Sequence, residues 1–169
     1  MLSIDRLDTA LLRMLVQDAR RGVVDLSVTL GVSRNTVQSR LRRLEEAGIL
    51  TGYRVEIDLA QVGAPVQAFL ALEIQQAMLS DVIAHLTANP QVLEVHATTG
   101  REDLLVRVAA PSQAGLQDLI QQILATRGVV HSTTTLALTT PLPYRAMPFI
   151  EHITRETGWG RSTPAASDE

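Results

Sequence analysis

The chain has 169 residues, of which 46% are hydrophobic and 20% charged, so it can bury the core of one large domain or of two small ones. It contains no cysteine, which excludes disulfides and thiolate sites, and only 3% aromatic residues, which argues against stacking platforms for single-stranded nucleic acid. The net charge is −3 and the pI is about 5.8, but all 15 basic residues are arginine, and four of them lie between Ser33 and Leu44, where no acid occurs.

Three short helices are predicted within the first fifty residues. The first spans about Thr9 to Arg20 behind Asp8 as its N-cap, because leucines and valines recur there at helical spacing. A second short apolar segment ends at Gly31, a residue type suited to the left-handed position just past a helix. The third helix begins behind Ser33, a good N-cap, and ends at Gly48.

The second and third helices match a helix-turn-helix, which needs a glycine-containing turn and a second helix whose polar outer face can enter the major groove. Arginine can pair with guanine, and asparagine or glutamine with adenine, so Arg34, Asn35 and Gln38 are predicted to contact base edges. The Ser33 and Thr36 hydroxyls and the later arginines are predicted to contact phosphate. The full predicted DNA-binding set is Ser33, Arg34, Asn35, Thr36, Gln38, Ser39, Arg40, Arg42 and Arg43. The alternative interpretation is a surface helix with ordinary solvated charges.

The rest of the chain predicts the element order βαββαβ. Alternation at Thr51–Ile57 first indicates a short strand, followed by a linker that ends at Pro65. Four strands follow, at residues 66–74, 92–99, 104–109 and 129–139, with two helices capped by Ser80 and Ser112. This order is the ferredoxin-like arrangement, an antiparallel sheet with both helices on one face. Its bare face predicts burial against a second copy of the chain, a homodimer.

The predicted organisation is an α+β chain in four parts. Residues 1–50 form the helix-turn-helix domain, 51–65 the hinge strand and linker, 66–140 the βαββαβ domain, and 141–169 a tail. The tail contains a helix-compatible stretch, residues 149–157, and is expected to be disordered from Ser162 onward. Because the chain shows no signal-peptide pattern and no apolar run of membrane-spanning length, we expect a cytoplasmic protein without a membrane partner.

The sequence resembles the Lrp/AsnC group of feast-or-famine regulators over about residues 2–140, more specifically in its first half. The matching segments are Ile4–Asp8, Asp25–Ser27, Gly31–Ser33, Val37–Glu45 and Gly48–Tyr53. The resemblance implies a transcriptional regulator with a winged-helix domain that binds double-stranded DNA, a hinge strand and a ligand-sensing domain. It also implies dimers that assemble into tetramers or octamers, with amino acids as the usual effectors.

The resemblance places the effector between dimers, near the turn that joins the second and third strands of the sensing domain. The family turn resembles Gly-Asp-x-Asp-Tyr, and here it reads Gly100-Arg101-Glu102-Asp103-Leu104. An amino acid needs an acceptor for its ammonium group, for which Asp103 is predicted, and donors for its carboxylate, for which hydroxyls are predicted. The predicted effector set is Thr98, Thr99, Gly100, Arg101, Asp103, Thr133 and Thr135, with Ser132 and Thr134 as further hydroxyls.

Other interpretations of these residues stay open. Arg101 stands where the family has an acid, which indicates a different ligand, an anionic one or none. The turn alternatively forms a mixed-charge surface hairpin, and β-propensity alone accounts for threonines in a strand.

Neither a metal, nor a cofactor, nor an enzyme activity is predicted. The four histidines lack metal-ligand spacing, and no phosphate loop, nucleophile motif or paired catalytic carboxylates occur. Two alternatives to a regulator remain. One is a tetrapyrrole-processing decarboxylase, similar to this family in architecture, although it would not need a basic recognition helix. The other is an architectural protein that compacts DNA without an effector.

Overall fold

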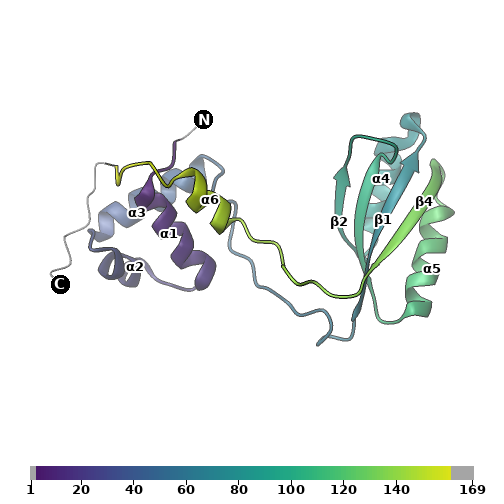
Figure 1. The fold of residues 1–169 in the computed structure, drawn as a ribbon, viewed down its shortest axis with the longest axis horizontal. Coiled ribbons are helices and arrows are strands. Elements are labelled where there is room, and N and C mark those ends of the chain that lie inside the picture. Colours follow the sequence, from purple (N-terminus) through teal and green to yellow (C-terminus); the bar gives the residue numbers. More distant parts are fainter. Residues whose placement is uncertain (1–2, 161–169) are drawn as a thin grey trace. The chain divides into compact units, whose positions relative to one another are not determined.

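The computed structural model describes residues 3–160 (Figure 1). The chain forms two compact units, one made of Met1–Val55 with Pro143–Glu169 and the other of Glu56–Leu142. The chain thus leaves the first unit, builds the second and returns. The sequence predicts residues 141–169 as a separate tail, whereas residues 143–160 belong to the first unit, and the stretch expected to be disordered, from Ser162 onward, lies outside the described residues.

The first unit is helical and begins with α1 (Arg6–Gln17), α2 (Val23–Leu30) and α3 (Arg34–Glu46). Helix α1 starts three residues earlier than predicted because Asp5, not Asp8, is its N-cap. The Asp5 carboxylate accepts from the Asp8 backbone N–H at 3.0 Å, and the Asp8 carboxylate accepts from the Asp5 N–H at 3.1 Å, a reciprocal capping box. The caps around the turn are as predicted: Gly31 has a φ of 63°, and the Ser33 hydroxyl accepts from the Thr36 N–H at 3.0 Å.

Two apolar clusters hold the first unit together. One lies among α1, α2 and α3 and consists of Leu11, Met14, Leu15, Leu26 and Val37. The other joins Leu12 of α1 and Leu44 of α3 to Met147 of α6 (Met147–Ile153). The sequence predicts a helix-compatible stretch at 149–157, so the observed helix is shifted by a few residues toward the N-terminus and is shorter.

The predicted strand at Thr51–Ile57 does not form. Tyr53, Val55 and Ile57 are each at least half exposed, and no residue from 3 to 65 adopts a strand, so the described helical unit also lacks a β-wing. The prediction was wrong because an alternating segment forms a strand only where a partner strand accepts and donates its backbone hydrogen bonds. Within this single chain, residues 51–57 have no such partner.

The second unit is a four-stranded antiparallel sheet in the order β2-β3-β1-β4. Its strands are β1 (Val66–Ile74), β2 (Val92–Ala97), β3 (Leu104–Ala110) and β4 (Val129–Ala137). Helix α5 (Gln113–Leu124) is capped by Ser112, as predicted. Helix α4 (Leu79–Ala88) has Met78 rather than the predicted Ser80 as its N-cap, because the 3-10 turn Gln76–Met78 leads directly into it.

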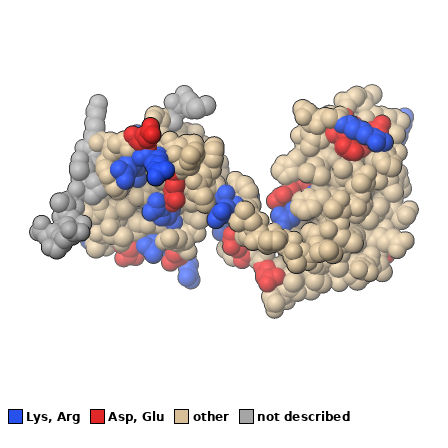
Figure 2. All heavy atoms as spheres, viewed as in Figure 1, with Lys and Arg blue, Asp and Glu red and all other residues tan. Residues whose placement is uncertain are grey.

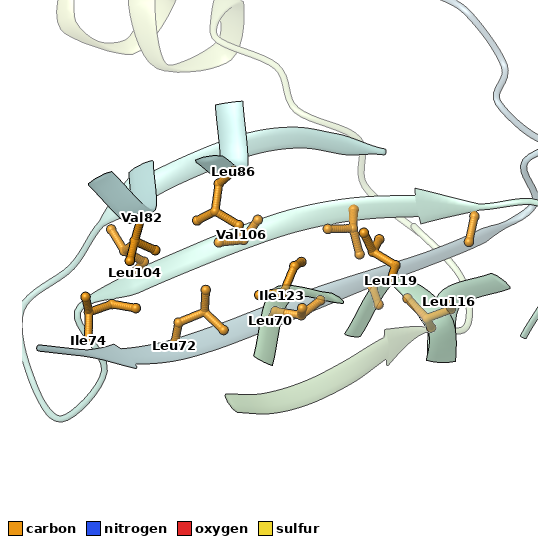
Figure 3. Packing of buried hydrophobic residues seen from close by; sticks show 13 residues of the cluster. Leu70, Leu72, Ile74, Val82, Leu86, Leu104, Val106, Leu116, Leu119 and Ile123 are labelled. Atoms are coloured by element: carbon orange, nitrogen blue, oxygen red, sulfur yellow. The ribbon is translucent and has the colours of Figure 1, made fainter. Parts of the chain in front are cut away.

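Helices α4 and α5 cover one face of the sheet, where alternate strand residues and the inner helix residues form one core (Figure 3). The core residues include Leu70 and Leu72 of β1, Leu104 and Val106 of β3, Val82 and Leu86 of α4, and Leu116, Leu119 and Ile123 of α5. The α+β fold class with a βαββαβ domain is therefore as predicted. Among the described residues, no helix is both long and apolar enough to cross a membrane.

Candidate nucleic-acid interface

The outer face of α3 carries a polar stripe at helical spacing. Arg34, Asn35, Gln38, Ser39 and Arg42 are all exposed, and the last four line the same surface hollow. Val37 and Leu44 are fully buried on the opposite side, so the packing determines which face points outward. The structure therefore brings together, on one accessible stripe, the residues predicted to contact base edges.

Ser33 and Thr36 lie at the start of α3 and bind each other. The Ser33 hydroxyl caps the helix at the Thr36 N–H, and the two side-chain oxygens are 2.8 Å apart. Free backbone N–H groups at a helix N-terminus attract anions, so this end can approach a phosphate. The hydroxyls keep unused hydrogen-bonding capacity there.

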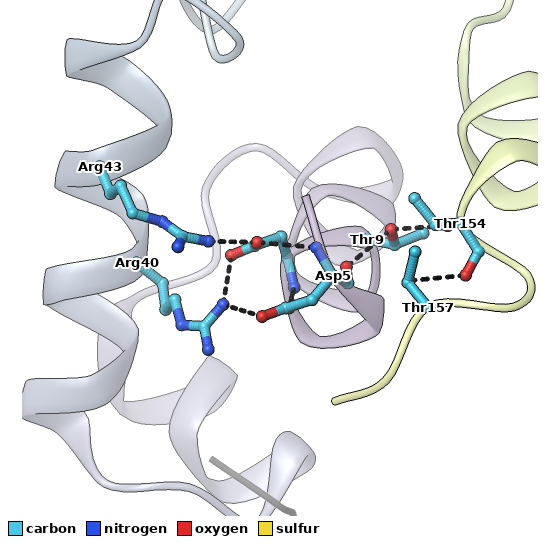
Figure 4. Close-up of polar contacts among 7 residues, drawn as sticks. Asp5, Thr9, Arg40, Arg43, Thr154 and Thr157 are labelled. Atoms are coloured by element: carbon cyan, nitrogen blue, oxygen red, sulfur yellow. Dashed lines mark hydrogen bonds and ion pairs between the residues drawn. The ribbon is translucent and has the colours of Figure 1, made fainter. Parts of the chain in front are cut away.

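Arg40 and Arg43, by contrast, bind the carboxylates at the N-terminus of α1, those of the N-cap Asp5 and of Asp8 (Figure 4). Arg40 pairs with Asp5 and lies 3.0 Å from Oδ1 of Asp8, while Arg43 pairs with the other oxygen of Asp8. Asp8 is fully buried, and the Arg40 side chain is only 11% exposed. The sequence predicts phosphate contacts for both arginines, but in this unit they hold α3 against α1, and Arg40 presents almost no surface.

This cluster shifts the titration of Asp5. Burial opposes ionisation of the carboxyl group, but hydrogen bonds from Arg40 and from the Asp8 backbone, with the charges of Arg40 and Arg43, outweigh it. The pKa of Asp5 therefore lies below its usual value.

Arg42, unlike Arg40 and Arg43, is not held by a buried acid. It pairs only loosely with Glu46 at 3.6 Å, and both side chains are largely exposed.

Charge is distributed unequally between the two units. The helical unit contains twelve arginines and ten acidic residues, whereas the unit Glu56–Leu142 contains three arginines and eight acidic residues. On the face shown in Figure 2, basic and acidic side chains of the helical unit lie next to one another. A polyanion is therefore attracted to the helical unit and not to the sheet unit.

The turn between β2 and β3 is closed by its own hydrogen bonds. The Thr98 N–H donates to the Asp103 carbonyl at 2.9 Å, and the Thr98 hydroxyl donates to the Glu102 carbonyl at 2.6 Å. The Asp103 carboxylate accepts from the Ile74 N–H at 2.7 Å and from the Gln76 side-chain amide at 2.5 Å. The residue predicted to receive an ammonium group thus already ties the turn to the end of β1. Thr99, Gly100 and Arg101 are exposed.

The remaining predicted effector hydroxyls lie elsewhere on the sheet. Thr133 and Thr135 of β4 pair with Ala71 and Phe69 of β1, so a whole strand separates them from β3 and its turn. Ser132 and Thr134 alternate with them and point to the helix-covered face. Within one chain, the structure does not bring the β4 threonines to the turn.

Comparison with known proteins agrees with this arrangement. Residues 4–45 match the AsnC-type helix-turn-helix domain, and residues 67–147 match the Lrp/AsnC ligand binding domain. The regulatory protein AsnC of Escherichia coli is 31% identical over 134 residues, which cover 79% of this chain and 88% of AsnC. The chain belongs to the Lrp/AsnC family.

Further relatives of this Lrp/AsnC regulator extend the likeness. The transcriptional regulator FL11 of Pyrococcus horikoshii is 26% identical over 147 residues, 84% of this chain and 97% of FL11. The structure of E. coli AsnC superimposes with a TM-score of 0.80 at 29% identity, covering 87% of this chain and 100% of AsnC. A feast or famine regulatory protein of M. tuberculosis complexed with L-methionine gives a TM-score of 0.77 at 32% identity, covering 85% and 98%.

FL11 is named as a transcriptional regulator and AsnC as a regulatory protein. Together with the matched helix-turn-helix domain, this makes the present Lrp/AsnC protein a DNA-binding transcriptional regulator and not an enzyme. Two features of its site were missed by sequence reasoning. Asp5 and Asp8 are polar partners of the recognition helix, and α6 packs on it. The helical spacing of α1 showed only that Asp8 was a cap candidate, and no signal in the tail pointed to α3.

Proposed function

We propose that the protein regulates transcription by binding specific sequences of double-stranded DNA as a homodimer or larger homo-oligomer, and that an amino acid or a related small molecule modulates this binding. One observation carries the proposal. The start of α3 exposes an arginine, an asparagine and a glutamine side by side, while its other face is fixed by buried packing.

The chemistry of this stripe suits base reading. A guanidinium can donate two parallel hydrogen bonds to guanine, and an amide can both donate to and accept from adenine in the major groove. Arg34, Asn35 and Gln38 supply these groups near the helix start, the part of a recognition helix that contacts base edges. Arg42, one to two turns later and exposed, is suited to a phosphate.

Selection from random duplexes with alanine variants tests the roles of these residues. We expect Arg34→Ala, Asn35→Ala and Gln38→Ala to change the selected sequence, each at a cost of roughly 1–3 kcal/mol on the original site. Arg42→Ala should weaken binding to every sequence and lower the salt dependence. Arg20→Ala, an exposed arginine outside α3, is the matched control and should change neither. Uniform weakening by all four α3 variants would favour the architectural alternative.

Two observations support the effector part of the proposal. A similar protein was solved with L-methionine, and the exposed turn residues 98–101 include Gly100, which has no side chain and open space around it, so a ligand can approach the backbone closely. Because the Asp103 carboxylate accepts two bonds and has lone pairs left, it can still receive an ammonium group. Arg101 is exposed, and within the described part of the chain it pairs with no acid, so it can meet a carboxylate.

A thermal-shift screen with L-methionine and the other amino acids tests this part. A ligand at a hundred times its Kd should stabilise the folded protein by about 2.7 kcal/mol. Asp103→Asn, which keeps an oxygen for the Ile74 N–H but removes the charge, should reduce the shift for a zwitterion. Arg101→Ala should matter more for a ligand with a second carboxylate. A ligand whose shift survives both substitutions binds elsewhere.

A further inference from the structure

We propose that residues 143–160, which we call the return segment, position the recognition helix α3 and thereby set how strongly the protein prefers its specific DNA sequence. The inference rests on the proposed sequence-specific binding. The match to the ligand binding domain ends at residue 147, and all of E. coli AsnC is covered by 87% of this chain. Most of the return segment, residues 148–160, therefore lies beyond the residues that match this family domain.

The first contact of the return segment is apolar and reaches α3 itself. Met147 is almost fully buried against Leu12 of α1 and Leu44 of α3, and Ile150 packs at the edge of the same cluster. The apolar cluster among α1, α2 and α3 contains Val37, near the start of α3, whereas the cluster with Met147 contains Leu44, near its end. Without Met147, Leu44 would lose a neighbour at the end of the helix away from the base-reading residues.

The second contact fixes α1. The buried Thr9 hydroxyl donates to the buried Thr154 hydroxyl at 3.0 Å (Figure 4). The Thr154 hydroxyl in turn donates to the Ile150 carbonyl at 2.8 Å. The Arg6 N–H at the start of α1 donates to the Gly158 carbonyl at 3.0 Å, and the Arg6 guanidinium lies 5.3 Å from the Trp159 ring centre. The return segment therefore holds the first turn of α1, where Asp5 and Asp8 bind the two α3 arginines.

Both contacts act on the placement of α3 rather than on DNA. Base reading depends on short, directed hydrogen bonds, whereas attraction to phosphate tolerates small shifts of a charge. A recognition helix that is less firmly held should lose specific affinity and retain non-specific affinity. The return segment thus acts as a positioning element.

The test uses the full chain with Met147→Ala and, as matched control on the same helix, Phe149→Ala, whose side chain is 68% exposed. Affinities for the selected sequence and for an unrelated duplex are measured at one salt concentration, together with hydrogen exchange of the α3 amides. We expect Met147→Ala to lower the ratio of specific to non-specific affinity about tenfold, to leave non-specific affinity within about twofold, and to speed α3 exchange. Phe149→Ala should change none of these.

Thr154→Val and Thr154→Ser give a second, milder pair. Valine removes the hydroxyl that binds Thr9 and should shift the ratio in the same direction, and serine, which keeps it, should restore the ratio. If Met147→Ala and Thr154→Val leave the ratio and α3 exchange unchanged, or if Phe149→Ala lowers the ratio equally, the inference is wrong. If the unaltered chain shows no sequence preference, the proposed function fails, and faster α3 exchange in Met147→Ala alone would still support the positioning role.

Discussion

Asp8 combines three interactions in one buried carboxylate. It completes the capping box of α1 and binds both Arg40 and Arg43 of α3. A buried ion pair adds little net stability compared with an apolar replacement, but removing one partner leaves charges without compensation. Asp8 therefore matters because two arginines depend on it.

We expect Asp8→Ala to destabilise the helical unit by roughly 3 kcal/mol or more, because two guanidinium groups lose their buried partner. Asp18→Ala is the control, since Asp18 pairs with a largely exposed Arg20 and its loss should destabilise the unit much less. Urea unfolding followed by fluorescence of Trp159, the only tryptophan, reports on this unit. Equal losses in the two variants would contradict the buried-pair interpretation.

Asp5 should make the helical unit sensitive to acid. Its pKa is lowered in the folded state, because the Arg40 and Asp8 hydrogen bonds and the nearby arginine charges outweigh its burial. Its contribution is therefore complete above the unfolded-state pKa, about 3.9, and is lost as the pH falls through the folded-state pKa. Asp5→Asn keeps a good N-cap without the charge, so the Tm of this variant should fall less steeply than that of the unaltered chain as the pH drops below about 4. If the Tm of Asp5→Asn and that of the unaltered chain fell in parallel with pH, the Asp5 charge would not contribute to the acid sensitivity.

At the scale of the elements, two glycines of the sheet unit differ in whether their position can hold a larger side chain. Gly128 precedes β4 with a φ of 99°, and a Cβ there would lie 2.5 Å from the Met78 Cβ and 3.2 Å from a Val82 methyl. Gly115 lies in the first turn of α5, where the nearest atoms to an added Cβ are at an ordinary 3.5 Å.

Gly128→Ala should therefore destabilise the chain by about 2 kcal/mol or more, from left-handed strain and overpacking. Gly115→Ala should be neutral or stabilise it by up to roughly 1 kcal/mol, since alanine favours a helix. Thermal unfolding followed by far-UV circular dichroism compares the two. If Gly128→Ala were as stable as the unaltered chain, Met78 and the start of α4 would be able to shift away from the added methyl group at no cost.

At the scale of the whole molecule, one face of the sheet carries no helix from its own unit, Glu56–Leu142. The strand register places Phe69, Leu105 and Ala109 there, with Arg107 donating to Gln67 at 2.8 Å and to Glu94 at 3.5 Å. A sheet face that mixes apolar residues with paired polar ones suits an interface with a second copy. An exposed phenylalanine beside polar groups that are already paired is better suited to contact with a second copy of the sheet than to contact with water.

We expect residues 56–142, expressed alone, to form a dimer or larger oligomer at micromolar concentration and to show no DNA affinity, because the recognition helix lies in the other unit. Phe69→Glu should shift this fragment toward a monomer. The control Leu124→Glu changes a side chain of similar exposure, 39% against 37%, on helix α5 and should not. Light scattering measures the outcome, and a monomeric unaltered fragment would contradict the assignment of this face.

Features with a local signal could be predicted from the sequence. Gly31, Ser33 and Ser112 mark helix ends because a cap depends on a residue and its near neighbours. The apolar periodicity of α3 showed its outer face, and the alternating strands indicated βαββαβ. Predictions from local signals failed where the outcome depended on distant residues or on a choice between two nearby candidates. Two neighbouring acids could each cap α1, and alternation at Thr51–Ile57 contained no information on whether a partner strand exists.

The sequence by itself therefore determined the order and type of most elements, the exposed face of the recognition helix and the resemblance to the Lrp/AsnC family. Only the tertiary structure decided which polar groups meet. Arg40 and Arg43 bind acids more than thirty residues away, Asp103 binds the end of β1, and Thr154 binds Thr9 across 145 residues. Periodicity shows that a side chain faces inward or outward, but its partner depends on how distant elements pack, and no local pattern encodes that choice.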